Sequence, residues 1–341
     1  MSHLVWASVT RIVDREGARV TWDRRPRDPW RSGDYVVARV DRPDGGLIEA
    51  PDGHRIDVEP GDMVVGVLGT RRATLEVVGD WAEVGHDGVM QTLTRAGLFG
   101  SVTSVASFAR PYVVDLTYQG HLRLDGAFQS MSDWALAAPA RPADRRTPAI
   151  VLIGTSMSSG KTTTARVLIR RLTGMGLSVA GAKLAGVARL ADTLAMRDSG
   201  ARATWDFVDA GLPSTVAAPE VVTRASERVL AAVDAERADI LVCEVGASPL
   251  EPYRGDTVLD LLGDRIVLTV LCASDPYAVV GAIEAFGVRP DVVAGRAAAT
   301  SAARALVARL SGLEALDATD PQRWSRLEEI VEDALGSIDG A

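Results

Sequence analysis

The pattern of apolar and polar positions divides the 341-residue chain into two halves with different periodicity. Up to about residue 140, short Val-rich runs alternate with turns such as "DREG", "RPDGG" and "APDGH". The segments "GDYVVARVD" and "GDMVVGVLG" share an opening, in which a Gly-Asp turn leads into an apolar strand. Closely spaced strands with Asp-Gly turns predict a small, mostly antiparallel barrel or sandwich over 1–140. Within it, we interpret the Gly- and Ser-rich segment 92–107 as a turn with a helical piece.

The second half has the pattern of an α/β domain. The polar, proline-bearing segment "PARPADRRTP" contains a linker, which we place at 141–148. Beyond it, apolar runs without alternation are followed by helical stretches. The runs are 148–153, 178–184, 239–243, 265–271 and 291–294, and the helical stretches are 161–173, 225–237, 276–286 and 300–310. This order predicts a mostly parallel sheet, buried on both faces, in a domain at 149–341.

Composition narrows the classes of protein. A formal net charge of −8 argues against a general nucleic-acid binder, which needs a basic surface. Cys243 and Cys272 both lie in apolar runs, and we expect buried free thiols in a reducing cytoplasm. No apolar run approaches the ~20 residues of a membrane helix, and the N-terminus shows no cleavage signal. We therefore expect a cytoplasmic protein without a membrane or nucleic-acid partner.

One strand-to-helix junction, "VLIGTSMSSGKTTTARVLI" at 151–169, carries candidate chemistry. The loop before Lys161 contains small or flexible residues, so its backbone N–H groups can line a concave anion site at a helix N-terminus. Lys161 supplies charge to the β- and γ-phosphates, and Thr162 supplies a hydroxyl for Mg²⁺. The predicted nucleotide-binding residues are Gly154, Thr155, Ser158, Ser159, Gly160, Lys161, Thr162 and Thr163.

The spacing of this loop supports a family resemblance. Five residues separate Gly154 from Gly160, one more than in the usual pattern, so Thr155 stands at the usual first-glycine position. "GTSMSSGKTTT" resembles the Gly-Thr-x-x-x-x-Gly-Lys-Thr loop of the dethiobiotin synthetase-like P-loop NTPase superfamily. Related loops occur in molybdopterin-guanine dinucleotide accessory proteins and in P-loop proteins with an extra N-terminal domain. The resemblance covers about 148–315 and implies ATP and Mg²⁺ as cofactors.

Two later strand ends match the resemblance in order. "LSVAGAKLAG" contains Lys183, where dethiobiotin synthetases have a substrate-facing lysine, and this implies a catalytic role for Lys183 beside Lys161. "ADILVCEV" places Glu244 after four apolar residues. An acid at such a strand end is the metal-side pattern of P-loop NTPases, where a carboxylate binds Mg²⁺ directly or through water. We therefore predict a metal site with Thr162 and Glu244, and the resemblance implies that one aspartate after the Lys183 strand completes it.

Four aspartates between these strands compete for the remaining metal position: Asp192, Asp198, Asp206 and Asp209. We rank Asp198 first and Asp192 second, because "RDSGA" resembles an Asp-Ser run in the molybdopterin-related proteins. Arg197, Glu251 and Arg254 are weaker candidates for substrate contacts.

The remaining segments leave the base and the oligomeric state open. The run "RIVLTVLCASDPYAVVGAIEAFG" resembles a strand and helix that often lie at a dimer interface in the family, which implies a homodimer. "VAGRAA" lacks the asparagine found in many relatives, so ATP and GTP both stay open.

Other chemistries fit the sequence less well, and two functions remain. All four histidines lie in the first half, away from any nucleophile-type turn, and no Cys/His cluster indicates zinc. The first function is an ATP- and Mg²⁺-dependent enzyme that transfers the γ-phosphoryl group to a small-molecule acceptor, kinase-like or ligase-like. The alternative is a nucleotide-dependent switch or accessory NTPase whose N-terminal domain binds a protein partner. A binding-only nucleotide sensor is a third hypothesis, and the sequence does not identify an acceptor.

Overall fold

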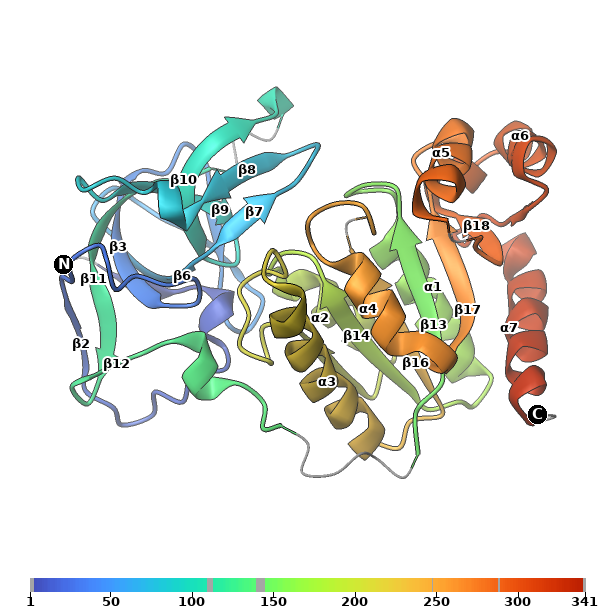
Figure 1. The fold of residues 1–341 in the computed structure, drawn as a ribbon, viewed down its shortest axis with the longest axis horizontal. Helices are drawn as coiled ribbons and strands as arrows, with labels where there is room; N and C mark the ends of the chain where they lie inside the picture. The colour runs from blue at the N-terminus through green and yellow to red at the C-terminus, as the bar shows by residue number, and fades with distance from the viewer. Residues whose placement is uncertain (1–2, 109–112, 139–144, 247, 288, 340–341) are drawn as a thin grey trace. The chain divides into compact units, whose positions relative to one another are not determined.

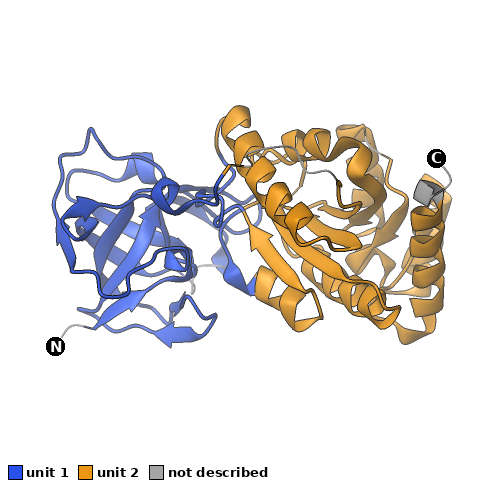
Figure 2. Ribbon diagram, turned by 90° about the horizontal axis from the view of Figure 1, so that it is seen from below, with its two compact units in different colours: residues 1–137, 187–191, 207–216 blue, residues 138–186, 192–206, 217–341 orange. Residues whose placement is uncertain are grey.

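The structure is a computed structural model that describes residues 3–108, 113–138, 145–246, 248–287 and 289–339. The chain divides into two compact units (Figure 2). The β unit contains Met1–Ala137 with two later segments, Val187–Ala191 and Phe207–Val216, and the α/β unit contains the rest. The sequence did not predict that these two segments belong with the N-terminal strands. Residues 139–144, which include the start of the predicted linker, lie outside the described residues.

The β unit contains a closed five-stranded barrel. Its described strands are β1 (Leu4–Trp6), β2 (Val20–Asp23), β3 (Tyr35–Arg42), β4 (Leu47–Glu49), β5 (Arg55–Asp57), β6 (Met63–Leu68), β7 (Thr70–Arg72), β8 (Val77–Asp80), β9 (Val89–Thr94), β10 (Leu98–Val105), β11 (Asp115–Leu124) and β12 (Ala127–Phe128). Strands β6, β3, β11, β9 and β10 pair in that order, and β10 then pairs with β6 to close the ring. Closure leaves none of these five strands as a sheet edge.

The repeated Gly-Asp segments form neighbouring strands of the barrel. β3 and β6 run antiparallel, with Val37 opposite Val65, and both side chains are fully buried. The helical interpretation of 92–107 is wrong, because this segment forms the end of β9, a turn and β10. Gly97 adopts a left-handed φ of 92° in the turn, and the fully buried Leu98 and Phe99 begin the next strand. Core burial therefore overrides the Gly/Ser-rich composition.

The α/β unit confirms the predicted parallel sheet. Its elements are β13 (Ala149–Gly154), α1 (Lys161–Gly174), β14 (Val179–Ala185), α2 (Leu190–Asp198), β15 (Ala203–Asp206), α3 (Pro219–Ala235), β16 (Ile240–Val245), α4 (Gly255–Leu262), β17 (Ile266–Cys272), α5 (Pro276–Phe286), β18 (Val292–Ala294), α6 (Ser301–Ser311), β19 (Glu314–Ala315) and α7 (Trp324–Asp339) (Figure 1). The strand order is β15-β14-β16-β13-β17-β18-β19, and every pair is parallel. This is the α/β architecture that the sequence predicts, with the loop strand β13 at the centre of the sheet.

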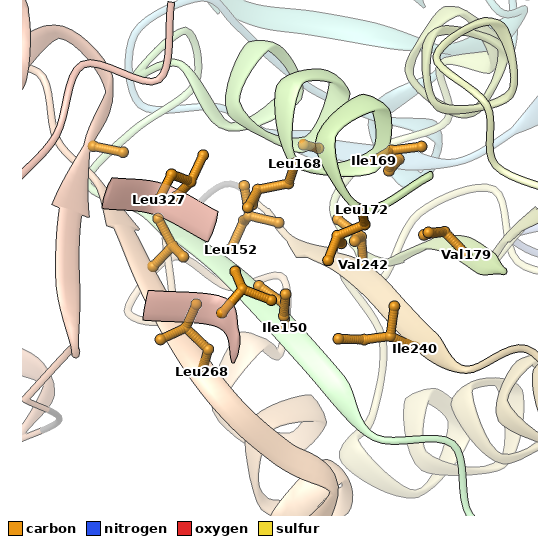
Figure 3. Packing of buried hydrophobic residues seen from close by; sticks show 14 of the residues in the cluster. Ile150, Leu152, Leu168, Ile169, Leu172, Val179, Ile240, Val242, Leu268 and Leu327 are labelled. Atoms are coloured by element: carbon orange, nitrogen blue, oxygen red, sulfur yellow. The ribbon is translucent and has the colours of Figure 1, made fainter. Parts of the chain in front are cut away.

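Helix α1 covers one face of this sheet. Ile150 and Leu152 of β13 and Val242 of β16 pack against Leu168 and Leu172 of α1 (Figure 3). Because side chains of a strand alternate between faces, every second residue of these strands faces α1. The thiols of Cys243 and Cys272 are free and buried, as expected.

Among the helices that the structure describes, none combines the length and apolar character that a membrane span requires.

Candidate functional site

Three neighbouring strands of the α/β unit end in buried charged residues. Lys183 of β14 lies opposite Asp206 of β15 on one side and Glu244 of β16 on the other. All three are at most 6% exposed. Val179, Gly181 and Lys183 are alternate residues of β14, so their side-chain positions share the face of the sheet that α1 covers. Glu244 of β16 lies opposite Lys183 on the same face. The three charges therefore lie on the α1 face, at the edge of the sheet where ligands bind in open α/β folds.

The loop between β13 and α1 is held by two neighbouring elements. The backbone N–H of Thr155 donates to the carbonyl of Cys272 at 3.2 Å, and Thr155 Oγ1 accepts from the N–H of Ser274 at 3.1 Å. Both contacts come from the end of β17, so the start of the loop is tied to the adjacent strand. At the other end, Gly160 has a left-handed φ of 110°, and a Cβ there would lie 2.9 Å from the Cα of Gly295.

Gly295 makes the close approach on the other side of this contact. It begins the short helix η6 (Gly295–Ala298) with a φ of 74°, and a Cβ there would lie 2.2 Å from the carbonyl oxygen of Ser159. The N–H of Arg296 donates to the same carbonyl at 3.4 Å. The segment "VAGRAA" therefore packs directly on the loop, and only residues without a side chain fit at this crossing.

Lys161 is the first residue of α1 and is buried. Its Nζ donates to the carbonyl of Ser156 at 2.8 Å and lies 3.5 Å from Ser159 Oγ. Burial lowers the pKa of Lys161, while the charge of Glu244 acts in the opposite direction. The ammonium group thus folds over its own loop, where phosphate oxygens can replace the neutral carbonyl as stronger acceptors.

Glu244 has one partnered and one unpartnered carboxylate oxygen. Thr162 Oγ1 donates to Oε2 at 3.3 Å, and Oε1 is buried without a hydrogen-bond partner among the described residues. Burial raises the pKa of Glu244 to about 7, repulsion from Asp192 adds to it, and the two lysines and Thr162 oppose it. A buried carboxylate oxygen without a donor is a suitable ligand for a cation.

A magnesium ion fits these donors. Within the described part of the chain, no three His, Cys, Asp or Glu side chains are grouped to hold a metal by themselves. Mg²⁺ does not need such a cage, because it keeps several waters and binds through one or two carboxylates plus substrate phosphates. Thr162 and Glu244 would hold it here.

The second lysine is paired within the α/β unit. Lys183 Nζ lies 2.7 Å from Asp192 Oδ2, and both side chains are almost fully buried. Asp192 lies in the first turn of α2, whereas Asp198 is its exposed last residue. Six residues along a helix correspond to about 9 Å, so Asp198 is not brought to the charged cluster. Of the two aspartates ranked for the metal site, Asp192 is therefore the one that lies beside the charged strand ends, where it pairs with Lys183.

The other candidates are placed in different surroundings. Asp209 belongs to the β unit, where it pairs with Arg11 at 2.9 Å. Arg197 is exposed on α2, and Arg254 donates to the carbonyl of Ala217 at 2.8 Å. Glu251 is buried, and its charge acts on Lys161. Of the three predicted substrate contacts, only Glu251 therefore lies near the loop lysine.

Lysine usage is a signal that the sequence reasoning missed. The chain has 37 Lys and Arg residues, of which 35 are Arg and only two, Lys161 and Lys183, are Lys. Both lysines are buried in this charged cluster. A lysine ammonium is a compact charge with three donors, whereas the planar guanidinium of arginine fits a different geometry. The sequence thus uses lysine only where the structure places the candidate site.

Comparisons with known proteins complete the description. No family model matches the chain, and no curated protein matches it. Solved structures with a similar arrangement include the signal recognition particle receptor FtsY from Elizabethkingia anophelis, at 17% identity and a TM-score of 0.31, with 48% of this chain and 54% of that chain covered. A DUF1611 family protein from Anabaena variabilis has 15% identity and a TM-score of 0.38, with 60% and 63% covered.

A third similar structure is the hydrogenase maturation factor HypB from Archaeoglobus fulgidus. It has 16% identity and a TM-score of 0.36, with 55% of this chain and 90% of that chain covered. The chain spans less than two thirds of the FtsY and DUF1611 structures.

Proposed function

We propose that the α/β unit binds a nucleoside triphosphate with Mg²⁺ in the loop before α1 and hydrolyses it. The observation that carries this proposal is that Oε1 of Glu244 is buried and has no hydrogen-bond donor among the described residues, while Oε2 of the same carboxylate accepts from Thr162. Glu244 lies at the sheet edge from which α1 and its first residue, Lys161, begin. A cation that also binds phosphate oxygens would give the unpartnered Oε1 of Glu244 a positively charged partner.

The arrangement suits phosphoryl transfer, in which catalysis consists mainly of positioning and electrostatic stabilisation. The bond between the γ-phosphorus and its bridging oxygen breaks, the oxygen of water forms the new bond to phosphorus, and that water gives up a proton to the solvent. The bridging oxygen leaves on the diphosphate. Lys161 would exchange the Ser156 carbonyl for phosphate oxygens, and its full charge would spread over the transferring group. Thr162 and Glu244 would hold a magnesium ion, which would neutralise part of the negative charge on the phosphates.

Transfer to a small-molecule acceptor is a second candidate function, of kinase or ligase type. The observation in its favour is the second lysine, because Lys183 is buried at the same strand ends and lies in register with Glu244. Simple hydrolysis does not require two buried ammonium groups. An accessory switch, in which the β unit binds a protein partner, remains the alternative to both enzymatic functions.

Binding and turnover test the proposal together. Calorimetry with ATP and with GTP, with and without Mg²⁺, is expected to show Mg²⁺-dependent binding of at least one nucleotide and to identify the base. Lys161→Ala should abolish it, while Arg170→Ala, which removes an exposed cation from the same helix, should not. Absence of triphosphate binding by the full chain would overturn the proposal.

Product analysis separates hydrolysis from transfer. ³¹P NMR of reactions with small carboxylates and amines should show inorganic phosphate alone for hydrolysis. A new phosphate ester or acyl phosphate indicates a kinase, and a new amide together with inorganic phosphate indicates a ligase.

A further inference from the structure

We propose that the β unit controls the position of Lys183 through helix α2, with Glu49 as the positioning residue. The proposal rests on the nucleotide function described above and deepens it. It assigns a nucleotide-sensing role to residues that lie more than 130 positions before Lys183 in the sequence.

Glu49 holds the beginning of α2 within the β unit. Its carboxylate is 6% exposed, and both oxygens accept hydrogen bonds from backbone N–H groups at the start of the helix. Leu190 N donates to Oε1 at 2.8 Å, and Ala191 N donates to Oε2 at 3.1 Å. The first N–H groups of an α-helix do not bond to carbonyls of the helix, so a carboxylate can accept from them, and it also interacts favourably with the positive end of the helix dipole.

A second residue fixes Glu49 itself. Ser8 Oγ donates to Glu49 Oε1 at 2.5 Å, and Ser8 is fully buried. Ser8 and Glu49 are therefore joined by hydrogen bonds to the first two residues of α2. All four residues belong to the β unit.

The next residue of this helical turn, Asp192, belongs to the α/β unit and pairs with Lys183. Asp192 directly follows Ala191, and its carboxylate holds Lys183 Nζ at 2.7 Å. Neighbouring residues of a helical turn are separated by a fixed rise and rotation. A displacement of the helix start that breaks the Glu49 contacts therefore also displaces the carboxylate that holds Lys183.

A second segment supports the same coupling. Phe207–Val216 follows Asp206 directly and belongs to the β unit, as Val187–Ala191 follows the strand of Lys183. The two segments pair with each other through the Val187–Ser214 bridge and through Ala188 N, which donates to Pro213 O at 3.2 Å. Two of the three strands that end in charged residues, β14 and β15, are thus followed along the chain by segments of the β unit.

The consequence is a nucleotide-dependent switch. A γ-phosphate at Lys183 competes with Asp192 for the ammonium group, so nucleotide binding releases Asp192 and alters the helix start held by Glu49. By linkage, a partner that binds the β unit and shifts Glu49 changes nucleotide affinity by the same factor by which nucleotide changes the affinity for that partner. We expect a coupling factor of roughly tenfold, within the usual range for allosteric pairs.

The two lysines of the chain give a residue-specific measurement. Amine acetylation followed by peptide mass spectrometry reports Lys183, with Lys161 as an internal reference. Glu49→Gln leaves one oxygen that can accept but places an NH₂ group against a backbone N–H. We expect it to raise Lys183 labelling several-fold with little change at Lys161. Ser8→Ala removes one hydrogen bond to Glu49 and should act in the same direction with smaller effect.

Matched variants keep this test independent of folding. Asp320→Asn alters another capping carboxylate, which accepts from the N–H of Gln322 at 3.0 Å, and should leave Lys183 labelling unchanged. If Glu49→Gln does not fold, Ser8→Ala decides the question. Unchanged Lys183 labelling in the folded variants overturns the inference, even where triphosphate binding is intact.

A double-mutant cycle measures the coupling to nucleotide. Asp192→Asn removes the competing carboxylate and should tighten triphosphate binding roughly tenfold. Glu49→Gln should tighten it less, and the double variant should not exceed Asp192→Asn alone. If the effects of the two substitutions on triphosphate affinity add up in the double variant, Glu49 and Asp192 act independently and the proposed coupling is contradicted. If the wild-type protein binds no triphosphate, the proposed function fails, and the labelling experiment still decides whether Glu49 positions Lys183.

Discussion

Lys183 and Glu244 lie opposite each other at the carboxyl ends of β14 and β16, on the face of the sheet that α1 covers. Each is almost fully buried, and each has a different second partner, Asp192 for the lysine and Thr162 for the glutamate. Burial raises the pKa of Glu244, and Lys183 and Lys161 lower it. The site therefore contains one buried negative and one buried positive group side by side, so Glu244 can bind a cation and Lys183 can bind an anion.

Glu244→Gln should remove magnesium dependence. The variant keeps the size of the side chain but loses the charge that a divalent cation requires, so Mg²⁺-dependent turnover should fall by roughly 100-fold. Any triphosphate binding measured without Mg²⁺ should equal that of the wild type, since Lys161 and the loop are intact. Steady-state hydrolysis over a range of Mg²⁺ concentrations measures this. Asp256→Asn, at an exposed acid of α4, is the control and should behave as wild type.

Glu244 should also make stability depend on pH. Its folded-state pKa of about 7 is raised above the unfolded value. The free energy of unfolding is therefore highest in acid, where Glu244 is protonated in both the folded and the unfolded state. The free energy of unfolding falls as pH rises from about 4.3 through about 7, and above that range the total loss should be a few kcal/mol. Denaturant unfolding at pH 5 and pH 8 should show Glu244→Gln gaining stability over wild type at pH 8 only. An equal difference at both pH values would exclude this role.

The sequence predicted the parts of the fold that depend on periodicity. Continuous apolar runs identified the strands of the α/β unit because both faces of that sheet are buried, as at Val242 and Leu241. Lys183 and Glu244 stood out because a charged residue that ends an apolar run must lie at a strand end. The loop before Lys161 was recognisable since its small residues and Gly-Lys-Thr are adjacent in the chain.

Features that depend on contacts distant in sequence could not be predicted. The different surroundings of Asp192 and Asp198 depend on where α2 begins, and the first N–H groups of this helix donate to Glu49, far away in the chain. The strands at 92–107 depend on burial of Leu98 and Phe99 inside a closed barrel. The inclusion of 187–191 and 207–216 in the β unit is equally a property of the folded chain.

Lys183→Ala distinguishes transfer from a switch. For phosphoryl transfer to an acceptor, removal of the buried ammonium should lower product formation by at least roughly 100-fold, with a much smaller change in triphosphate affinity. Lys183→Arg should not restore the activity, because the guanidinium is larger and planar. Single-turnover product analysis with calorimetry measures both quantities. Intact product formation in Lys183→Ala would eliminate transfer by this site.

Gly295→Ala should disturb the nucleotide loop from outside it. The new Cβ would lie 2.2 Å from the carbonyl oxygen of Ser159, at a residue whose φ is 74°. The loop must move or the backbone must change, so we expect a loss of about 1–3 kcal/mol in stability and at least roughly tenfold in triphosphate affinity. Gly312→Ala is the matched control, since Gly312 has a φ of 69° and a Cβ there would meet only the end of the Arg289 side chain, at 3.5 Å. It should lose stability through backbone conformation alone and bind triphosphate as wild type does. Equal affinities of the two variants, measured by calorimetry, would show that the contact between Gly295 and the loop does not shape the site.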